Sequence, residues 1–328
     1  MNCSESTAVC VIIVSYRTAA LTVSCLRSLL PERSLSDITI SAVVVDNASG
    51  DAQEIASAIK AEGWSSWVTL IVAPRNGGFA YGNNLGFAQA LKDNPPAYLH
   101  MLNPDTQIKP GAIHSLVQFL NIHPEVGIAG SSFENHDGSD WPFAFRFPSL
   151  LSELEGGLNL GLVSQLLKRW AVVRTMSPHA QPIDWGAGAS MMIRSELLTR
   201  IGGLDESYFL YFEETDFCWR SKRAGAPMWY VPESRVMHIG GQSTKVTERN
   251  VAPKRLPAYW FESRRRYFMR TGGLTRAILI DLVALIAHSL GSMKLAMQGR
   301  RDSAIPNFLQ DLWCHSVIHR KNRSLGED

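Results

Sequence analysis

The chain has 328 residues, of which 45% are hydrophobic and 19% charged, a balance that excludes a disordered protein and suits one large α/β domain with an appendage, or two domains. The formal net charge is only +2, but residues 249–328 carry 14 Lys and Arg against 6 Asp and Glu, whereas the remainder carries 18 against 24. Such an acidic body with a basic end is typical of a protein that meets an anionic surface, or of one with a solvated helical tail.

The first half of the sequence alternates strand and helix signals. Four short apolar runs predict buried strands of a parallel sheet, at residues 9–16, 40–47, 68–74 and 97–103. Segments with apolar residues at helical spacing follow them, at residues 20–30, 52–62, 85–91 and 111–123. This order predicts an α/β fold with a mostly parallel central sheet, helices on both faces, and ligands at the carboxyl ends of the strands.

The second half is less regular. Residues 131–182 have the character of an insertion, with one helical stretch and no recognisable chemistry, and clearer strand and helix signals return at about residue 185. From about residue 257 onward the pattern predicts helices. We therefore expect a catalytic domain at 1–256 and a helical, basic region at 257–328.

Polar residues stand where each predicted strand ends. Any one of them could be a turn residue or a helix cap. Because four neighbouring strand ends share the feature, a nucleotide crevice is the better interpretation, in which Tyr16 stacks on a base and Asp46 accepts from the base or ribose. The residues are Ser15, Tyr16 and Arg17, then Asp46 and Asn47, then Asn76, Gly77 and Gly78, and finally Asn103 and Asp105.

The two common phosphate-binding loops are missing from the sequence. No GxGxxG follows the first strand, and neither GxxxxGKS nor GxxxxGKT occurs. A divalent cation, Mg²⁺ or Mn²⁺, is therefore the expected carrier of phosphate charge. Such an ion needs hard oxygen ligands, and the protein supplies few of them because phosphate and water provide the rest.

Six motifs resemble the family-two glycosyltransferases of the GT-A fold, and within them the bacterial rhamnosyltransferase-like branch. They cover about residues 11–244 and are, in order, VIIVSYRT, VVVDNASGD, NGGFAYGNNLG, LNPDT, GASMMIRSELLTRIGGLDESYFLYFEETDFCWRSKRAG and YVPESRVMHIGGQST. The resemblance implies a Rossmann-like GT-A domain that transfers a sugar, with inversion, from a nucleotide diphosphate such as dTDP-L-rhamnose. It implies a saccharide or lipid-linked saccharide acceptor in cell-surface polysaccharide synthesis, and we expect no nucleic-acid partner.

The same resemblance assigns the metal and donor residues. Asn103-Pro104-Asp105 stands where the family has its DxD aspartates, so that Asp105 is the one carboxylate left to hold the metal. His238 stands at the position of a metal-binding histidine, although a lone histidine after a strand is more often structural. Asn83 and Gly188 fall in motifs expected to contact the nucleotide sugar.

An acidic cluster at residues 213–216 is the expected catalytic centre. Inversion needs a base that takes the proton from the attacking hydroxyl, and by the resemblance this is Glu214, the second member of the pair with Glu213. Asp216 is grouped with them, but it precedes Arg220 by four residues and could instead orient that side chain. An acid-rich helix N-terminus is the structural alternative for the cluster. The aromatic rings expected on the acceptor side are those of Trp185 and Tyr211.

Two other functions stay open at this point. A nucleotidyltransferase also places a nucleotide and a metal on such a sheet, but it would carry a basic glycine-rich loop where this chain has SYRTAALT. A catalytically inactive scaffold that binds sugar or lipid would explain the single aspartate at 103–105 and the Glu-Glu pair.

The basic C-terminal region raises the question of a membrane. Residues 274–297 are long enough to span a bilayer, but Arg276, Asp281, His288 and Lys294 interrupt them, and we expect no spanning helix. Arginines between 264 and 276 beside this apolar stretch predict reversible binding to an anionic membrane surface. A packed helical pair or a homodimer contact is the alternative. The apolar positions at helical spacing are Leu279, Leu282, Val283 and Ile286.

Cysteine usage and the first residues bear on location. Five cysteines are scattered without a CxxC pair, which favours reduced thiols over a disulfide framework or a zinc site. The N-terminus is polar, and its first apolar run is too short for a secretory signal. We expect a cytoplasmic protein, peripheral at the inner face of the cell membrane.

Overall fold

The computed structural model describes residues 6–135, 138–141, 143–158, 161–238, 253–299 and 305–320. The chain forms two compact units. The first comprises Met1–Phe145, Thr175–Phe209 and Glu213–Lys245, and the second comprises Arg146–Arg174, Leu210–Phe212 and Val246–Asp328. The predicted division at residue 257 into a catalytic domain and a C-terminal region stays a prediction. The second unit also shows that residues 146–174 pack with the C-terminal helices.

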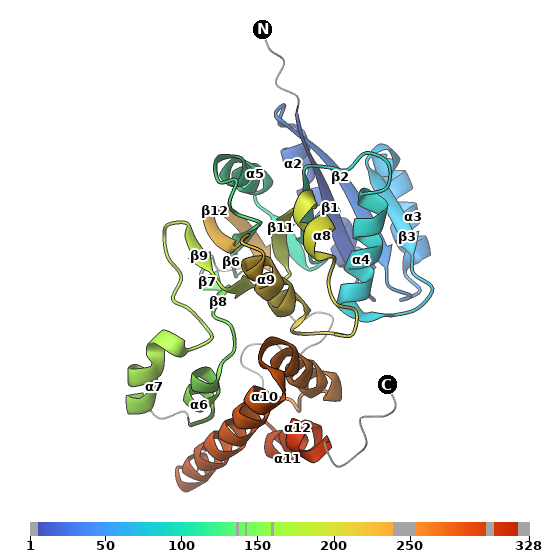
Figure 1. Ribbon diagram of the computed structural model, residues 1–328. Coiled ribbons are helices and arrows are strands. Elements are labelled where there is room, and N and C mark those ends of the chain that lie inside the picture. Colours follow the sequence, from blue (N-terminus) through green and yellow to red (C-terminus); the bar gives the residue numbers. More distant parts are fainter. Residues whose placement is uncertain are drawn as a thin grey trace. The chain divides into compact units, whose positions relative to one another are not determined.

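The first unit contains the sheet and its helices (Figure 1). Its strands are β1 (Thr7–Ser15), β2 (Ile38–Asp46), β3 (Val68–Val72), β4 (Tyr98–Leu102), β5 (Thr106–Ile108), β6 (Ile128–Glu134), β7 (Asp140–Trp141), β8 (Ala144–Phe145), β9 (Gln181–Ile183), β10 (Trp185–Gly186), β11 (Ser190–Arg194) and β12 (Met228–His238). Its helices are α1 (Ala19–Ser28), α2 (Leu30–Arg33), α3 (Ala52–Ala61), α4 (Gly78–Ala90), α5 (Ala112–Ile122), α8 (Ser195–Ile201), α9 (Glu213–Arg223) and the 3₁₀ turn η1 (Trp64–Ser66).

The sheet follows the order β3-β2-β1-β4-β11-β6-β12-β5, with β7 beside β6 and β9 beside β12. The four strands predicted from the first half lie side by side and parallel, and β12 is parallel to β6. β11 runs antiparallel to both of its neighbours, and β5 runs antiparallel to β12. The predicted mostly parallel α/β sheet is therefore confirmed.

Glycine spacing explains how α4 approaches β1. A Cβ on Gly82 would lie 2.6 Å from Val14 Cγ1, and one on Gly86 would lie 2.3 Å from Ile12 Cγ2. Two glycines four residues apart therefore form the flat helix face that meets this strand. Val11 and Ile13 point to the opposite face of the sheet and are fully buried as well. Both faces of β1 are covered, which accounts for its continuous apolar sequence.

The second unit is helical. Its elements are α6 (Leu150–Leu158), α7 (Gly161–Leu167), the 3₁₀ turn η2 (Lys168–Trp170), α10 (Ala258–Met297), α11 (Phe308–His315) and α12 (Val317–Arg320). Pro257 precedes α10, and Gly273 interrupts the helix with φ 70° and ψ −179°, so that α10 is two helical segments joined at a glycine. The predicted helical character of this region is confirmed.

Candidate functional site

The ends of β1 and β2 come together at one edge of the sheet. Ser15 at the end of β1 is in register with Asp46 at the end of β2, and the Ser15 carbonyl accepts from the Asn47 amide at 2.9 Å. Both side chains are buried, at 0% and 1% exposure. Tyr16 and Arg17 continue outward, and Arg17 has a positive φ of 58° with its guanidinium 5.3 Å from the Tyr16 ring centre.

Asn47 connects this edge to the start of α4. Its amide nitrogen donates to Asn76 Oδ1 at 3.1 Å and to the Gly78 carbonyl at 3.0 Å, and its Oδ1 accepts from the Gly77 amide. Gly78 has φ +86°, and a Cβ there would lie 2.0 Å from the carbonyl oxygen of Phe209. Of the two glycines predicted in this loop, Gly78 is thus required by a left-handed turn and by a close backbone approach.

Asp46 and Asn83 make local contacts. Asp46 Oδ1 accepts from the backbone amide of Ser49 at 3.2 Å and from its hydroxyl, which closes the turn after β2. Asn83 is 1% exposed and donates to the Phe79 carbonyl at 2.9 Å, one helical turn back. These bonds shape the walls of the edge, and the predicted ligand contacts of both residues stay predictions.

The buried strand β4 is followed by Asn-Pro-Asp-Thr, and these four residues form a turn. The Asn103 carbonyl accepts from the Thr106 amide at 3.3 Å and from its hydroxyl at 2.6 Å, so that residues 103–106 form a β-turn. The turn presents Asp105, which is 6% exposed, and His238 Nε2 lies 3.3 Å from Asp105 Oδ1. The β12–β5 ladder fixes this distance because His238 is paired with Thr106.

The donor atoms at this turn fit a divalent cation. Asp105 supplies a carboxylate and His238 an imidazole nitrogen, and Asn103 Oδ1 is buried without a hydrogen-bond partner among the described residues. In the ranges that the structure covers, no cluster of three or more His, Cys, Asp and Glu side chains occurs. The set therefore suits a cation that takes its remaining ligands from a diphosphate and water.

Cys25 supports the turn and was not predicted to do so. Its Sγ lies 3.6 Å from the Asn103 carbonyl and 3.7 Å from Thr106 Oγ1. Burial, with a smaller contribution from the nearby Asp105 charge, raises the pKa of this thiol to about 12, although the contact with Thr106 partly offsets the rise. The thiol therefore stays neutral and can donate to the turn.

Glu214 begins the second part of the site, at the first turn of α9. Its side chain keeps some exposure, but desolvation around the carboxyl raises its pKa from 4.5 to about 7, an effect that hydrogen bonds with the Glu214 and Gly188 backbones partly offset. Glu214 Oε2 is buried and has no hydrogen-bond partner in the described part of the chain. A carboxyl with these properties is suited to accept a proton near neutral pH.

A short stretch of backbone links the base to the turn. Gly188, which contacts Glu214, is followed by Ala189, whose carbonyl accepts from the Asn103 amide at 3.0 Å. A Cβ on Gly188 would lie 3.0 Å from the Phe79 ring, so this strand start is also packed against α4. The structure thus brings together the segments that carry Glu214, Asn103 and the α4 N-terminus.

Buried polar side chains hold the strand that follows Gly188. Ser190 Oγ lies 2.9 Å from His100 Nε2 and 2.7 Å from Ser131 Oγ, which in turn lies 2.8 Å from Ser234 Oγ. Burial lowers the pKa of His100 to about 3, and the imidazole is therefore neutral in the working range of an enzyme. This network joins four strands, and sequence patterns gave no sign of it.

The remaining acidic residues of the cluster are deeply buried. Glu213 is 2% exposed and Asp216 is 0% exposed. Asp216 pairs with Arg220 at 2.8 Å, as the spacing of four residues suggested, and Arg220 also donates to the carbonyls of Ile201 and Gly203. This geometry gives Asp216 a positioning role between α9 and the end of α8, and its catalytic assignment stays a prediction.

Asn84 also has a positioning role, which sequence patterns did not indicate. Its amide nitrogen donates to the Leu204 carbonyl at 2.8 Å, and its Oδ1 accepts from the Leu204 amide at 2.9 Å. The loop that leads to α9 is thereby fixed to α4.

The two predicted acceptor-side rings belong to different units. Trp185 on β10 stacks on Phe145, with ring centres 4.4 Å apart and 25° between the planes. Tyr211 belongs to the second unit, where its ring lies 6.1 Å from that of Tyr259. Tyr211 and Phe212 both have φ of 70°, an uncommon conformation for aromatic residues. A joint role of Trp185 and Tyr211 stays a prediction.

Comparison with known proteins places this geometry in context. The sequence model of the family described as Glycosyltransferase like family 2 matches residues 7–252. Over 146 residues the chain is 32% identical to the N-acetylglucosaminyl-diphospho-decaprenol L-rhamnosyltransferase of Mycobacterium tuberculosis, which covers 43% of this chain and 47% of that protein. Over 164 residues it is 26% identical to rhamnosyltransferase WbbL of Escherichia coli, covering 49% of this chain and 60% of that protein. The chain thus spans about half the length of the curated relatives it matches.

Solved structures resemble the fold. A mannosyltransferase from Pyrobaculum calidifontis in complex with GDP-Man and Mn²⁺ matches with a TM-score of 0.57 at 15% identity, over 98% of this chain and 89% of that one. GalNAc-T7 with UDP, GalNAc and Mn²⁺ matches with a TM-score of 0.52 at 15% identity, over 72% of this chain and 44% of that one. At this level of identity the likeness concerns the fold.

Proposed function

We propose that this chain, which belongs to the glycosyltransferase-like family 2, is an inverting rhamnosyltransferase that takes its sugar from dTDP-L-rhamnose. The observation that carries the proposal is the buried carboxyl of Glu214, with a pKa of about 7, linked through Gly188 and Ala189 to the Asn103–Asp105 turn. Two relatives named as rhamnosyltransferases support the choice of sugar.

In the proposed reaction Glu214 acts as the general base. It takes the proton of the acceptor hydroxyl while the hydroxyl oxygen bonds to the anomeric carbon, and the bond from that carbon to the diphosphate oxygen breaks on the opposite face. The products are the inverted glycoside, the nucleoside diphosphate and protonated Glu214. Glu214 as a residue is partly exposed, which supports access of an acceptor to it.

Asp105 and His238, with Asn103, would hold Mg²⁺ or Mn²⁺. When bound, the cation neutralises the charge that develops on the leaving diphosphate. Asp46 and the hydrogen-bonded pair of Asn47 and Gly78 would contact the nucleoside. They stand at the ends of neighbouring strands, which is the usual ligand edge of an open α/β sheet.

The proposed acceptor is a lipid-linked saccharide at the inner face of the cell membrane. The supporting observations are the acceptor lipid in the name of the mycobacterial relative and the basic C-terminal region. The enzyme would therefore act in cell-surface polysaccharide synthesis.

A nucleotide-sugar screen tests the proposal. We expect dTDP-L-rhamnose with Mn²⁺ to raise the melting temperature more than UDP- or GDP-sugars, and to be slowly hydrolysed to dTDP in a manner that depends on Mn²⁺. Stabilisation without any hydrolysis or transfer would favour the inactive scaffold. Release of pyrophosphate from a nucleoside triphosphate and a sugar phosphate would identify a nucleotidyltransferase.

A further inference from the structure

The second segment of α10, after Gly273, is apolar on two opposite sides. One side is buried in the helical unit and carries Ala277, Ile280, Ala284, Ala287 and Gly291. The other side forms an exposed stripe at intervals of three and four residues, and we call it the outer stripe. Its residues and their exposed fractions are Leu279 49%, Leu282 43%, Ile286 59%, Leu290 51%, Met293 62% and Met297 87%.

The buried side of α10 is firmly committed to the protein. Close packing brings α6 against it, since a Cβ on Gly291 would lie 2.1 Å from the Gly157 carbonyl oxygen. Such contact leaves no room for lipid on this side.

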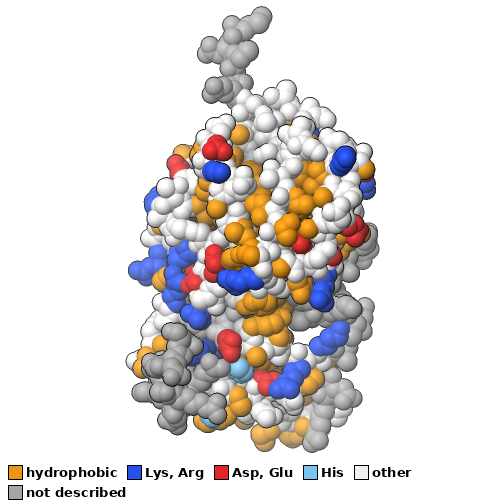
Figure 2. Space-filling view, turned by 90° about the vertical axis from the view of Figure 1, so that its right-hand side faces the viewer, with side chains coloured by type: hydrophobic (Ala, Val, Ile, Leu, Met, Phe, Trp, Pro, Cys, Tyr) orange, Lys and Arg blue, Asp and Glu red, His pale blue; other side chains and the backbone are white. Residues whose placement is uncertain are grey.

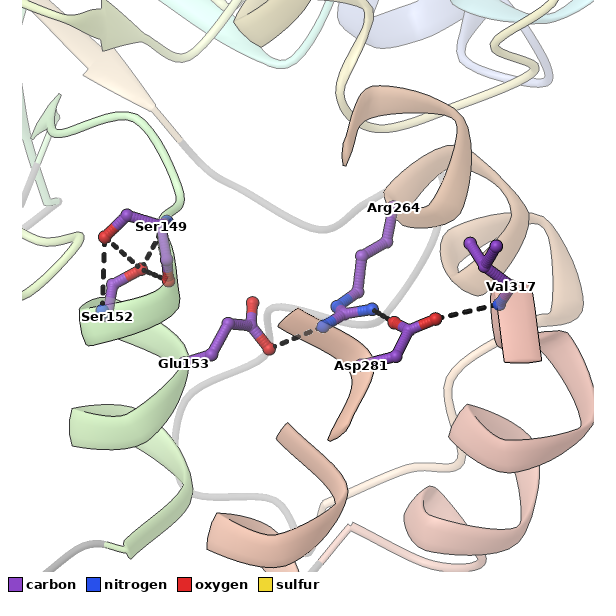
Figure 3. A network of polar contacts seen from close by, with 6 residues as sticks. All are labelled: Ser149, Ser152, Glu153, Arg264, Asp281 and Val317. Atoms are coloured by element: carbon purple, nitrogen blue, oxygen red, sulfur yellow. Dashed lines mark hydrogen bonds and ion pairs between the residues drawn. The ribbon is translucent and has the colours of Figure 1, made fainter. Parts of the chain in front are cut away.

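An ion network secures the same side (Figure 3). Arg264 donates to Asp281 Oδ1 at 2.6 Å and to Glu153 Oε2 at 2.8 Å, and Asp281 Oδ2 accepts from the Val317 amide at 2.8 Å. The network joins both segments of α10 to α6 and α12.

This arrangement bears on how α10 could meet a membrane. Among the described residues α10 is the one helix long and apolar enough to cross a bilayer, a test of length and composition alone. Spanning would require α10 to leave α6 and would place the charges of Arg264 and Asp281 in hydrocarbon, which is costly. A helix with one side packed and the other apolar lies along an interface instead.

The charges around the outer stripe favour an anionic membrane over a second copy of the chain as its partner. Arg276 is exposed three residues before Leu279, the first residue of the stripe, and Arg266 is exposed on the first segment of α10, before the break at Gly273. The acidic residues of α10 are Glu262, which faces His315 at 3.6 Å, and the buried Asp281. A second copy would therefore offer these arginines no acidic partner on the stripe, whereas anionic lipid headgroups complement them. Figure 2 shows, low in the view, hydrophobic side chains at the surface, with Lys and Arg side chains above them.

We propose that the outer stripe of α10 inserts into the headgroup region of an anionic membrane, with Arg266 and Arg276 on lipid phosphates. The inference rests on the proposed function in one respect, because a lipid-linked acceptor gives the enzyme a reason to reside there. It adds which face of the protein meets the lipid, and that the helix lies in the plane of the membrane.

Vesicle co-sedimentation of the full-length protein tests the proposal without any sugar donor, so that its outcome does not depend on the catalytic assignment. The vesicles contain phosphatidylcholine alone or mixed with phosphatidylglycerol. We expect binding to the mixed vesicles and release by high salt. Leu282→Gln with Ile286→Gln should weaken binding on the order of tenfold for each side chain, and Arg266→Gln with Arg276→Gln about fivefold for each charge.

Ile122→Gln is the matched control, because Ile122 is 71% exposed at the end of α5 and lies off the stripe. It should bind vesicles like the unchanged protein. All variants alter exposed side chains, and circular dichroism should show the same fold and melting temperature. Three results would overturn the proposal: equal binding of the stripe variants and the control, a dimer that the stripe variants dissociate without any loss of vesicle binding, or a requirement for detergent.

Discussion

Replacing Glu214 by Gln is the sharpest test of the proposed chemistry. Glutamine keeps the size of the side chain and a carbonyl oxygen that can accept a hydrogen bond from the Gly188 backbone. It cannot act as a base, however, and therefore cannot take the proton from the hydroxyl of the acceptor substrate. We expect turnover to fall by about 10²–10⁴-fold, the usual contribution of a general base, with little change in donor affinity.

The pKa of Glu214 adds two pH signatures. The protonated carboxyl is not a base, so kcat/KM of the unchanged enzyme should fall about tenfold for each pH unit below the pKa of about 7. The second signature concerns stability. Between 4.5 and about 7 the unfolded chain ionises Glu214 while the folded protein keeps it neutral, and folding stability therefore declines as pH rises through this window.

At about 1.36 kcal/mol per pH unit, ionising Glu214 in the folded protein costs up to about 3 kcal/mol at alkaline pH. Glutamine is neutral in both states and avoids this cost. The Gln variant should thus be nearly inactive, more stable than the unchanged protein by up to about 3 kcal/mol above pH 8, and similar to it near pH 4.5, the ordinary pKa of glutamate.

The measurements are initial rates of dTDP release against pH and urea denaturation at the two pH values. Glu213→Gln and Asp216→Asn serve as comparison variants. If either of them were inactive while Glu214→Gln turned over normally, the base would be misassigned. Equal urea midpoints for Glu214→Gln and the unchanged protein at alkaline pH would refute the claim that desolvation raises the pKa of Glu214.

The remaining predictions concern the proposed metal pair, one point of tight packing and one buried ion network. Asp105→Ala should abolish transfer with an unchanged circular dichroism spectrum, and normal turnover would remove Asp105 from the metal site. His238→Ala should act more mildly and raise the Mn²⁺ concentration needed for half-maximal rate; an unaltered Mn²⁺ titration would make the histidine structural. Gly78→Ala combines φ +86° with a Cβ 2.0 Å from a backbone oxygen, so urea denaturation should show a loss of at least about 1–3 kcal/mol, and no loss would contradict the close approach. Arg264→Met leaves Asp281 buried without its ion partner and should cost about 3–5 kcal/mol by the same assay, whereas an unchanged midpoint would mean that the network contributes little.

Local sequence patterns predicted those parts of the site that depend on one strand and its end. β1, β2, β3 and β4 were expected from short apolar runs, because a strand covered on both faces needs continuous apolar residues. The Asp216–Arg220 pair was expected from helical spacing alone.

Features that depend on distant segments were beyond the reach of such patterns. Cys25 reaches the Asn103 turn across 78 positions of sequence, and Ser131 meets Ser234 across 103. Nothing within one helical turn or one strand marks either contact. The packing of residues 146–174 with the C-terminal helices was missed for the same reason, since helical periodicity shows that a face is apolar without showing what covers it.

The place of β12 in the sheet has a consequence for how the enzyme is made. Among the described residues, β12 is the last strand of the sheet in sequence order, yet it lies between β6 and β5, and its end carries His238 beside Asp105. On the ribosome, a nascent chain that has exposed everything up to α8 still lacks Glu214, His238 and the ladder that seats β5. Because domains fold as units during synthesis, we expect the metal pair and the base to be completed together, within the final steps of folding of the first unit. Under the proposed function, chains that end before β12 would therefore lack a complete site for the nucleotide sugar.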